Sequence, residues 1–168
     1  ILPGSKNVRA DLEALRTAHW DQAMARHLRY GGKVFGICGG YQMLGRAIYD
    51  PAHTESAHDH VDGMGYLDME TTFAAEKLTA QVTADCTCLP FLGGHIEARD
   101  LPGYEIHMGR TDFGPDLCHP FHIKAKANQP FAADDGVVQD YQTAGQIVGT
   151  YIHGIFDHDG FRRQVINQ

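Results

Sequence analysis

KVFGICGGYQMLG, at residues 33–45, is the most informative segment of this chain. Residues 33–37 form a short, continuous apolar run, which is typical of a strand buried on both faces of a parallel sheet. Residues 41–48 have the composition of a helix. The segment therefore predicts a strand, a bend and a helix, with Cys38 at the bend.

The bend has the G-x-C-x-G form of a nucleophile elbow, a strained turn that holds a nucleophile between a strand and a helix. Glycines flank Cys38 because a Cβ atom at either neighbour would collide with the adjoining elements in so tight a turn. Amides at the start of the following helix would favour thiolate over thiol and could receive an oxyanion. The alternative is a small buried apolar residue, as most free cysteines are. The flanking strand and helix favour the nucleophile.

A thiolate that acts on an amide needs a histidine to take and return a proton. The chain has 11 histidines, and His153 is the best placed of them. It directly follows the apolar run at residues 147–152, so that it would emerge at the same sheet edge as Cys38. A hydrogen-bonded structural histidine is the alternative that these residues leave open.

Before this segment, hydrophobic periodicity predicts two helices. The turn at residues 3–7 leads into the first helix, for which Asn7 is the expected N-cap. The second helix has Trp20, Met24 and Leu28 at intervals of four, so that they share one face. A strand end at the start of the chain, followed by helices and the buried strand, is the opening of an α/β unit.

The rest of the chain is predicted to contain five further segments. They are a polar, histidine-rich loop at residues 49–62, several antiparallel strands at 66–113, an irregular segment rich in proline and aspartate at 114–136, a strand pair at 137–152 and a last helix at 157–168.

Composition limits the possible partners. Lys and Arg number 14 against 21 Asp and Glu, a formal net charge of −7, and no basic run interrupts this balance. Nucleic acid and anionic membrane are therefore not expected as partners. No apolar stretch reaches the length of about 18 residues that spans a bilayer, and no signal segment opens the chain. The expected compartment is the cytoplasm.

Cysteines and histidines do not indicate a disulfide scaffold or a metal site. Four cysteines are too few for a disulfide framework in 168 residues, so each is expected to be a free thiol: Cys38, Cys86, Cys88 and Cys118. Histidines crowd residues 53–60 and 118–122, but their spacing fits no standard zinc pattern. We therefore expect no physiological metal site.

Four blocks of this sequence resemble the glutamine amidotransferase domain of cobyric acid synthases. They are PGSKN at residues 3–7, GICGGYQMLG at 36–45, GYEIHMGRT at 103–111 and GTYIHGIF at 149–156. They occur in the family's order and span nearly the whole chain. The resemblance implies a class I, triad-type glutaminase domain over residues 1–168, shortened at its N-terminus. It implies a flavodoxin-like α/β fold, with a mixed, mostly parallel central sheet flanked by helices and with additional antiparallel strands.

The resemblance also implies roles for individual residues. Cys38 is similar to the family's nucleophile and His153 to its catalytic histidine. The amide of Gly39, with the amide of Gly4 in the preceding turn, would form the oxyanion hole. Gln42 falls where related amidotransferases hold the substrate glutamine.

The third block adds Glu105 and His107 as candidate substrate-binding residues, although an exposed charged strand would explain them nearly as well. One position departs from the wider class. Many class I amidotransferases have a glutamate two residues after the histidine, and here that residue is Ile155, which cannot orient or charge-stabilise an imidazole. The resemblance therefore leaves the orienting group of the histidine open.

No G-x-x-x-x-G-K-[ST] phosphate loop occurs in the chain, so we expect no cofactor here. The resemblance implies a separate N-terminal synthetase domain that uses ATP and Mg, and a corrinoid substrate whose carboxylates it amidates with ammonia from glutamine. Two alternatives remain. They are the glutaminase domain of cobyrinic acid a,c-diamide synthase, and a docking module without turnover. Residues 41–44 and 105–108 favour cobyric acid synthase over the diamide synthase.

Overall fold

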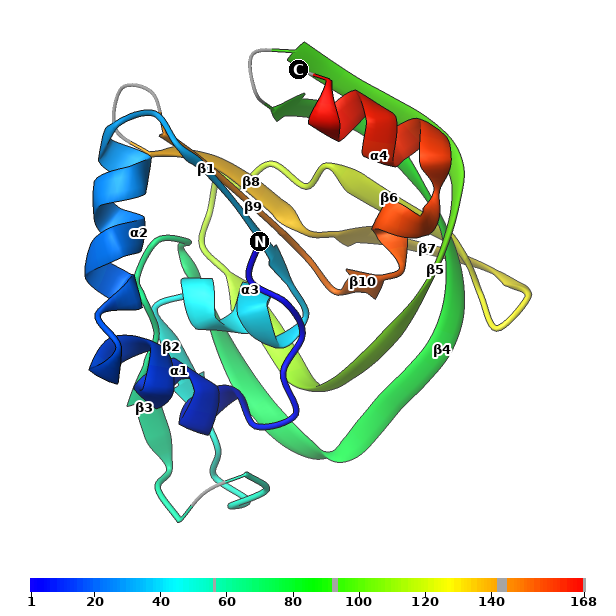
Figure 1. Cartoon of the computed structure of the whole chain (residues 1–168). Helices are drawn as coiled ribbons and strands as arrows, with labels where there is room; N and C mark the ends of the chain where they lie inside the picture. Colours follow the sequence, from blue (N-terminus) through cyan, green and yellow to red (C-terminus); the bar gives the residue numbers. More distant parts are fainter. Residues whose placement is uncertain (56, 92–93, 142–144, 168) are drawn as a thin grey trace.

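Two sheets and four α-helices make up the computed structural model, which describes residues 1–55, 57–91, 94–141 and 145–167, without the side chains at positions 75, 76 and 88 (Figure 1). The helices are α1 (Val8–Thr17), α2 (Trp20–Arg29), α3 (Gly39–Leu44) and α4 (Asp159–Ile166), with a short 3-10 turn at Ile155–Asp157. None of the helices in these ranges has the length and apolar composition that crossing a membrane requires.

The smaller sheet has the order β1-β9-β8 and forms the centre of the molecule (Figure 1). Its strands are β1 (Lys33–Ile37), β9 (Gly145–Thr150) and β8 (Val137–Tyr141). β1 pairs with β9 in parallel, and β8 adds antiparallel to β9. Leu2 bridges in parallel to Gly36 on β1, as expected of a strand end. The central sheet is thus mixed and mostly parallel, as predicted.

The larger sheet is antiparallel except for one pair, β2 with β4, among the described strands. Its members are β2 (Ala47–Tyr49), β3 (His60–Asp62), β4 (Met69–Phe91), β5 (Gly94–Phe113), β6 (Phe121–Lys126), β7 (Gln129–Asp135) and β10 (Ile152–His153). Figure 1 shows β4 and β5 as a long curved pair that sweeps past the central sheet. The additional antiparallel strands predicted for residues 66–113 are these two.

The helices before the central sheet follow the predicted pattern with one exception. The Asn7 side chain caps α1 by accepting a hydrogen bond from the Ala10 amide at 2.9 Å. On α2, Met24 and Leu28 are buried, but Trp20 is 60% exposed. Trp20 is the first residue of its helix and borders an open groove, so the apolar face that periodicity predicts is not covered at this end.

Two segments differ from the sequence-based expectation. The helix predicted through residue 48 ends at Leu44, and Ala47–Tyr49 instead pairs with β3 and β4. Residues 114–136, predicted to be irregular, contain the β6–β7 hairpin, which turns at two residues with positive φ, Ala127 and Asn128. β7 is mostly exposed, so no alternation of apolar residues marked it as a strand.

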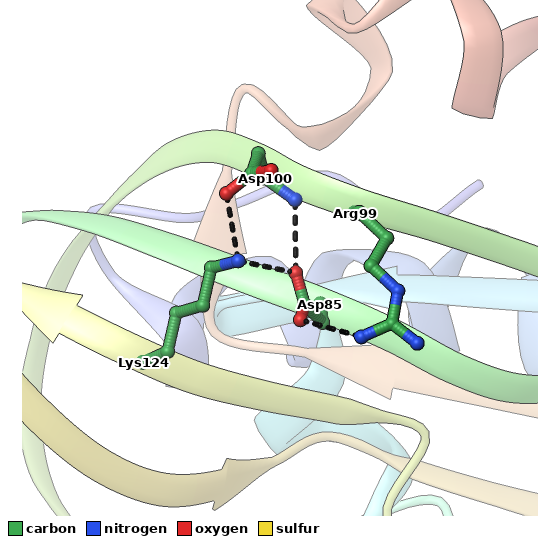
Figure 2. Close-up of polar contacts among 4 residues, drawn as sticks. All are labelled: Asp85, Arg99, Asp100 and Lys124. Carbon is green, nitrogen blue, oxygen red and sulfur yellow. Dashed lines mark hydrogen bonds and ion pairs between the residues drawn. The ribbon is translucent and has the colours of Figure 1, made fainter.

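A charged cluster joins β4, β5 and β6 (Figure 2). The Asp85 carboxylate accepts hydrogen bonds from the Lys124 ammonium and from the backbone amide of Asp100, both at 2.9 Å, and Arg99 lies 3.3 Å away. These bonds, first the one from Lys124, lower the pKa of Asp85 below its ordinary value of 3.8. The cluster lies at a register shift between β4 and β5 and so holds β5 in place where its pairing is interrupted.

Candidate active site

Cys38 lies at the end of β1, at the sharp bend into α3. Its backbone has φ 50° and ψ −111°, a conformation that L-residues rarely adopt. Two hydrogen bonds hold the bend: the Cys38 amide donates to the Thr150 carbonyl on β9, and the Gln42 amide donates to the Cys38 carbonyl, both at 2.9 Å. The strained turn predicted from the G-x-C-x-G pattern is present.

The thiol of Cys38 is protonated at neutral pH. The residue is only 5% exposed, and its Sγ donates to the Ile106 carbonyl on β5 at 3.1 Å. Burial raises the pKa of Cys38 to about 11, although a hydrogen bond from the Gly39 amide acts in the opposite direction. The Gly39 amide thus favours the thiolate, as expected of a helix amide, but desolvation outweighs it and the net shift favours the thiol.

His153 lies on the short strand β10, which pairs with β5 next to the central sheet. Its Nε2 is buried and has no hydrogen-bond partner among the described residues. Burial lowers the pKa of His153 below its ordinary value of 6.5, and a hydrogen bond with the Ile106 backbone opposes this shift. At neutral pH the imidazole is therefore neutral, the form that can accept a proton.

Gly4 brings the two side chains together. A Cβ atom on Gly4 would lie 2.8 Å from Cε1 of His153 and 3.7 Å from Cβ of Cys38, so both residues lie close to the point where a side chain at position 4 would begin. The structure thus confirms that β1 and β10 carry Cys38 and His153 to one place, although 115 positions separate them in the sequence.

The turn that contains Gly4 also lies against the start of α3. The Gly40 amide donates to the Pro3 carbonyl at 3.1 Å, and a Cβ atom on Gly39 would lie 2.8 Å from the Ser5 amide nitrogen. Within the described parts of the chain, the amides of Gly4 and Ser5 donate to no acceptor. Free amides beside the sulfur are what an oxyanion hole requires.

Cys38 and His153 line one cavity of about 630 Å³. Of the other residues predicted for the site, Gly4, Gln42 and His107 line it as well. Gly39 and Glu105 do not: the Gly39 amide hydrogen-bonds to the Cys38 sulfur, and Glu105 is buried with its carboxylate in an ion pair with Lys126 at 2.6 Å. We therefore assign Glu105 no substrate contact.

The floor of the cavity is a buried polar network. The side-chain nitrogen of Gln42, Nε2, donates to the Tyr151 hydroxyl at 3.3 Å and to the Met108 carbonyl at 3.4 Å. The His107 ring stacks on Tyr151 with ring centroids 4.1 Å apart, and its Nδ1 is buried without a partner in the described structure. Burial also lowers the pKa of His107. These contacts hold both side chains in place at the cavity wall.

The comparisons with known proteins agree with this geometry. Residues 1–161 match the family described as the CobB/CobQ-like glutamine amidotransferase domain. This chain belongs to that family. Similar curated proteins are the cobyric acid synthases of Paracoccus denitrificans, 43% identical over all of this chain, and of Bradyrhizobium sp., 46% identical over 96% of it. The chain spans 31% and 30% of the length of these two relatives.

A solved structure supports the fold of this amidotransferase domain. The crystal structure of a glutamine amidotransferase superposes with a TM-score of 0.52 at 14% identity, over 98% of this chain and 75% of that one. The α/β amidotransferase fold predicted from the sequence is confirmed.

Three residues of the amidotransferase site were missed in the sequence. Tyr104 stacks on His153, while Glu55 and Lys77 line the cavity. Tyr104 belongs to the third sequence block, and the adjacent Gly103 could have indicated that another strand approaches closely here. Glu55 and Lys77 lie in a polar loop and on an exposed stretch of strand, where charged residues are ordinary and carry no pattern.

The residue two positions after His153 lies in the hydrophobic core. Ile155 is fully buried in the hydrophobic core, packed with Phe156 and Phe161. Histidines and cysteines of the two crowded loops form no cluster that could hold a metal ion within the described ranges.

The raised pKa of Cys38 predicts an unusual pH dependence of alkylation. Because only the thiolate reacts, the rate of modification of Cys38 by iodoacetamide should keep rising above pH 9 and reach half of its limiting value near pH 11, whereas a cysteine with the ordinary pKa of 9.0 reaches half of its limiting rate at pH 9. Peptide mass spectrometry of the protein that carries this chain measures the rate at each pH. The exposed Cys118 is the internal control for reagent quality. A plateau for Cys38 below pH 9 would contradict the prediction.

Proposed function

We propose that this chain hydrolyses glutamine to glutamate and ammonia, with Cys38 as the nucleophile and His153 as the general base and acid. The observation that supports this most strongly is that the two side chains meet across Gly4 at the wall of a cavity of about 630 Å³. A thiol, a neutral imidazole and free backbone amides are the groups that acyl transfer from an amide requires.

In the proposed reaction, His153 takes the proton from the Cys38 thiol as sulfur attacks the carbonyl carbon of the glutamine side chain. The carbonyl oxygen becomes an oxyanion, which the amides of Gly4 and Gly39 stabilise. The tetrahedral intermediate collapses, its C–N bond breaks, and the imidazolium returns the proton to the leaving ammonia. A γ-glutamyl thioester remains on Cys38. Water, deprotonated by His153, then hydrolyses it to glutamate and regenerates the thiol.

The proposed reaction also accounts for the protonated state of the Cys38 thiol before attack. A thiol with a pKa of about 11 is a poor nucleophile at neutral pH, and the Cys38 thiol donates to the Ile106 carbonyl. Glutamine binding displaces water from the cavity and places an electrophile beside the sulfur, so proton transfer to His153 accompanies attack. The protonated thiol is thereby less open to oxidation and alkylation.

Charges in the cavity suit a free amino acid. Glu55 and Lys77 line it, and they act on Cys38 with opposite electrostatic signs. The Glu55 carboxylate is already oriented by the Val8 amide, which donates to it at 2.9 Å. One carboxylate and one ammonium match the ammonium and carboxylate of glutamine. Gln42 and His107, at the floor of the cavity, are the proposed contacts to the rest of the substrate.

We further propose that the ammonia serves the reaction of a cobyric acid synthase. The similar proteins bear that name and are about three times as long as this chain. The remaining portion would be the ATP- and Mg-dependent synthetase, in the same polypeptide and in the cytoplasm, which activates carboxylates of adenosylcobyrinic acid a,c-diamide in cobalamin biosynthesis. Residues 1–168 would form the glutaminase domain and need no cofactor of their own.

Labelling by a glutamine-analogue electrophile tests the proposal. The full-length protein is treated with 6-diazo-5-oxo-norleucine, and glutamate release is measured in parallel, each with and without ATP and the corrinoid. We expect one label per chain, on the peptide that contains Cys38, and glutamate release that this label abolishes. Absence of both under every condition would instead indicate a docking module without turnover.

A further inference from the structure

The ring of Tyr104 lies flat on the imidazole of His153. The ring centroids are 5.0 Å apart and the planes differ by only 6°. Tyr104 is 43% exposed, which is a high value for an aromatic residue in contact with a half-buried one. The stack is therefore not a by-product of core packing.

Backbone geometry places the two rings together. His153 is the register partner of Tyr104 where β10 pairs with β5. A Cβ atom on Gly103 would lie 2.7 Å from the His153 carbonyl oxygen and 2.4 Å from Cγ2 of Ile152. Any other residue at position 103 would push β10 away from β5, so the absence of a side chain there is what allows the close approach.

Other groups around His153 leave its orientation underdetermined. The position that is a glutamate in many class I amidotransferases is Ile155, which points into the core. In the part of the chain that the structure describes, the pKa of His153 responds to burial and to the Ile106 backbone, and no carboxylate contributes. Besides Tyr104, the other ionisable residues in the cavity wall are Lys6, Cys38, Glu55, Lys77 and His107, and none of them is a cause of the pKa shift of His153. A single backbone contact would still let the ring rotate.

We infer that Tyr104 is the positioning residue for His153, and that its ring takes over the orienting role of the missing carboxylate. A flat stack limits rotation of the imidazole about its Cβ–Cγ bond and shields one face from water. The buried, unpartnered Nε2 is thereby kept in one orientation, available for the proton of the thiol. The inference rests on the proposed role of His153 and adds the group that holds it.

Tyr104 also borders a second cavity of about 370 Å³, with Gly154 and Asp157 in its wall. Tyr104 therefore lines both cavities, including the one that contains Cys38. A positioning residue acts on the reaction through the imidazole that it holds. This predicts an effect on turnover and little effect on glutamine binding.

The test compares Tyr104→Leu, Tyr104→Phe and the wild-type full-length protein in glutamine hydrolysis. Loss of the ring should lower kcat by about 10- to 100-fold with KM within about twofold, since a displaced base costs turnover. Phenylalanine keeps the stack and should restore kcat to within about twofold. Tyr30→Leu, the same substitution at a residue that is 83% exposed and outside the cavity lining, is the matched control and should leave kcat unchanged.

A second readout is independent of turnover. In the protein labelled with ¹³C at Cε1 of histidine, the proton on Cε1 of His153 should resonate upfield in the wild type because of the Tyr104 ring current. The shift should persist in Tyr104→Phe and vanish in Tyr104→Leu. A wild-type resonance without this shift, a kcat of Tyr104→Leu within twofold of wild type, or a Phe variant as slow as Leu would each overturn the inference. If the wild type releases no glutamate, the proposed function fails, and the resonance still decides whether Tyr104 holds the ring.

Discussion

Replacement of Cys38 by alanine is expected to abolish glutamine-dependent turnover, with a fall in kcat of at least about 10⁴-fold. The variant has no sulfur to form the thioester, and the remaining groups give only the residual catalysis typical of an active site without its nucleophile. Alanine keeps the Cβ atom that lies next to Gly4, so little of the cavity wall is removed. Glutamate release by the full-length protein, measured with a coupled dehydrogenase, gives the result.

Free ammonia separates loss of chemistry from loss of fold in this variant. Under the proposed function, ammonium chloride supplies the nitrogen directly, so amidation of the corrinoid with ammonia should stay within about twofold of wild type. Cys118→Ala removes an exposed free thiol on another part of the surface and should affect neither reaction. Substantial glutamine-dependent activity in Cys38→Ala would refute the nucleophile assignment.

Replacement of His153 by alanine should lower kcat for glutamine hydrolysis by about 10²- to 10⁴-fold, the usual contribution of a general acid and base. The effect should be large here because the pKa of Cys38 is about 11, so few thiolates form without a base to take the proton. Labelling by 6-diazo-5-oxo-norleucine should slow in proportion. Raising the pH should recover part of both rates, because hydroxide then deprotonates the thiol.

His122→Ala is a suitable control for the second prediction. His122 is exposed, and its contact with Asp134 at 3.0 Å is a surface ion pair of little energetic value. Its loss should leave kcat within about twofold. If His153→Ala keeps more than a tenth of the wild-type rate while its thermal unfolding is unchanged, another group is the base, and His107 is the nearest candidate in the cavity wall.

Local patterns predicted the parts of the fold whose physics is local. The strand at Lys33–Ile37, the cap of α1 by Asn7 and the strained backbone at Cys38 each depend on neighbouring residues in the sequence. The prediction for residues 114–136 was wrong because the β6–β7 hairpin turns through two residues with positive φ and has an exposed outer strand. Its stability comes from pairing with β4, which lies about 40 residues earlier in the chain.

The candidate site shows the same division. Its two central side chains could be named from sequence because each follows a buried strand, and strands of one sheet end at a common edge. Glu105 could not be excluded in this way: only the structure shows that its carboxylate pairs with Lys126 on β6. Glu55 and Lys77 come from polar segments without periodicity, and only the cavity reveals that they share a site.

By itself, the sequence determined the strand–cysteine–helix bend, the histidine after a buried strand and the membership of an amidotransferase family. The tertiary structure decided three further properties: the protonation state of the Cys38 thiol, the place of Gly4 between Cys38 and His153, and the stack of Tyr104 on the imidazole. The reason is physical. Backbone conformation follows from a few adjacent residues, whereas desolvation, ring stacking and hydrogen bonding at a site depend on groups that only the folded chain brings together.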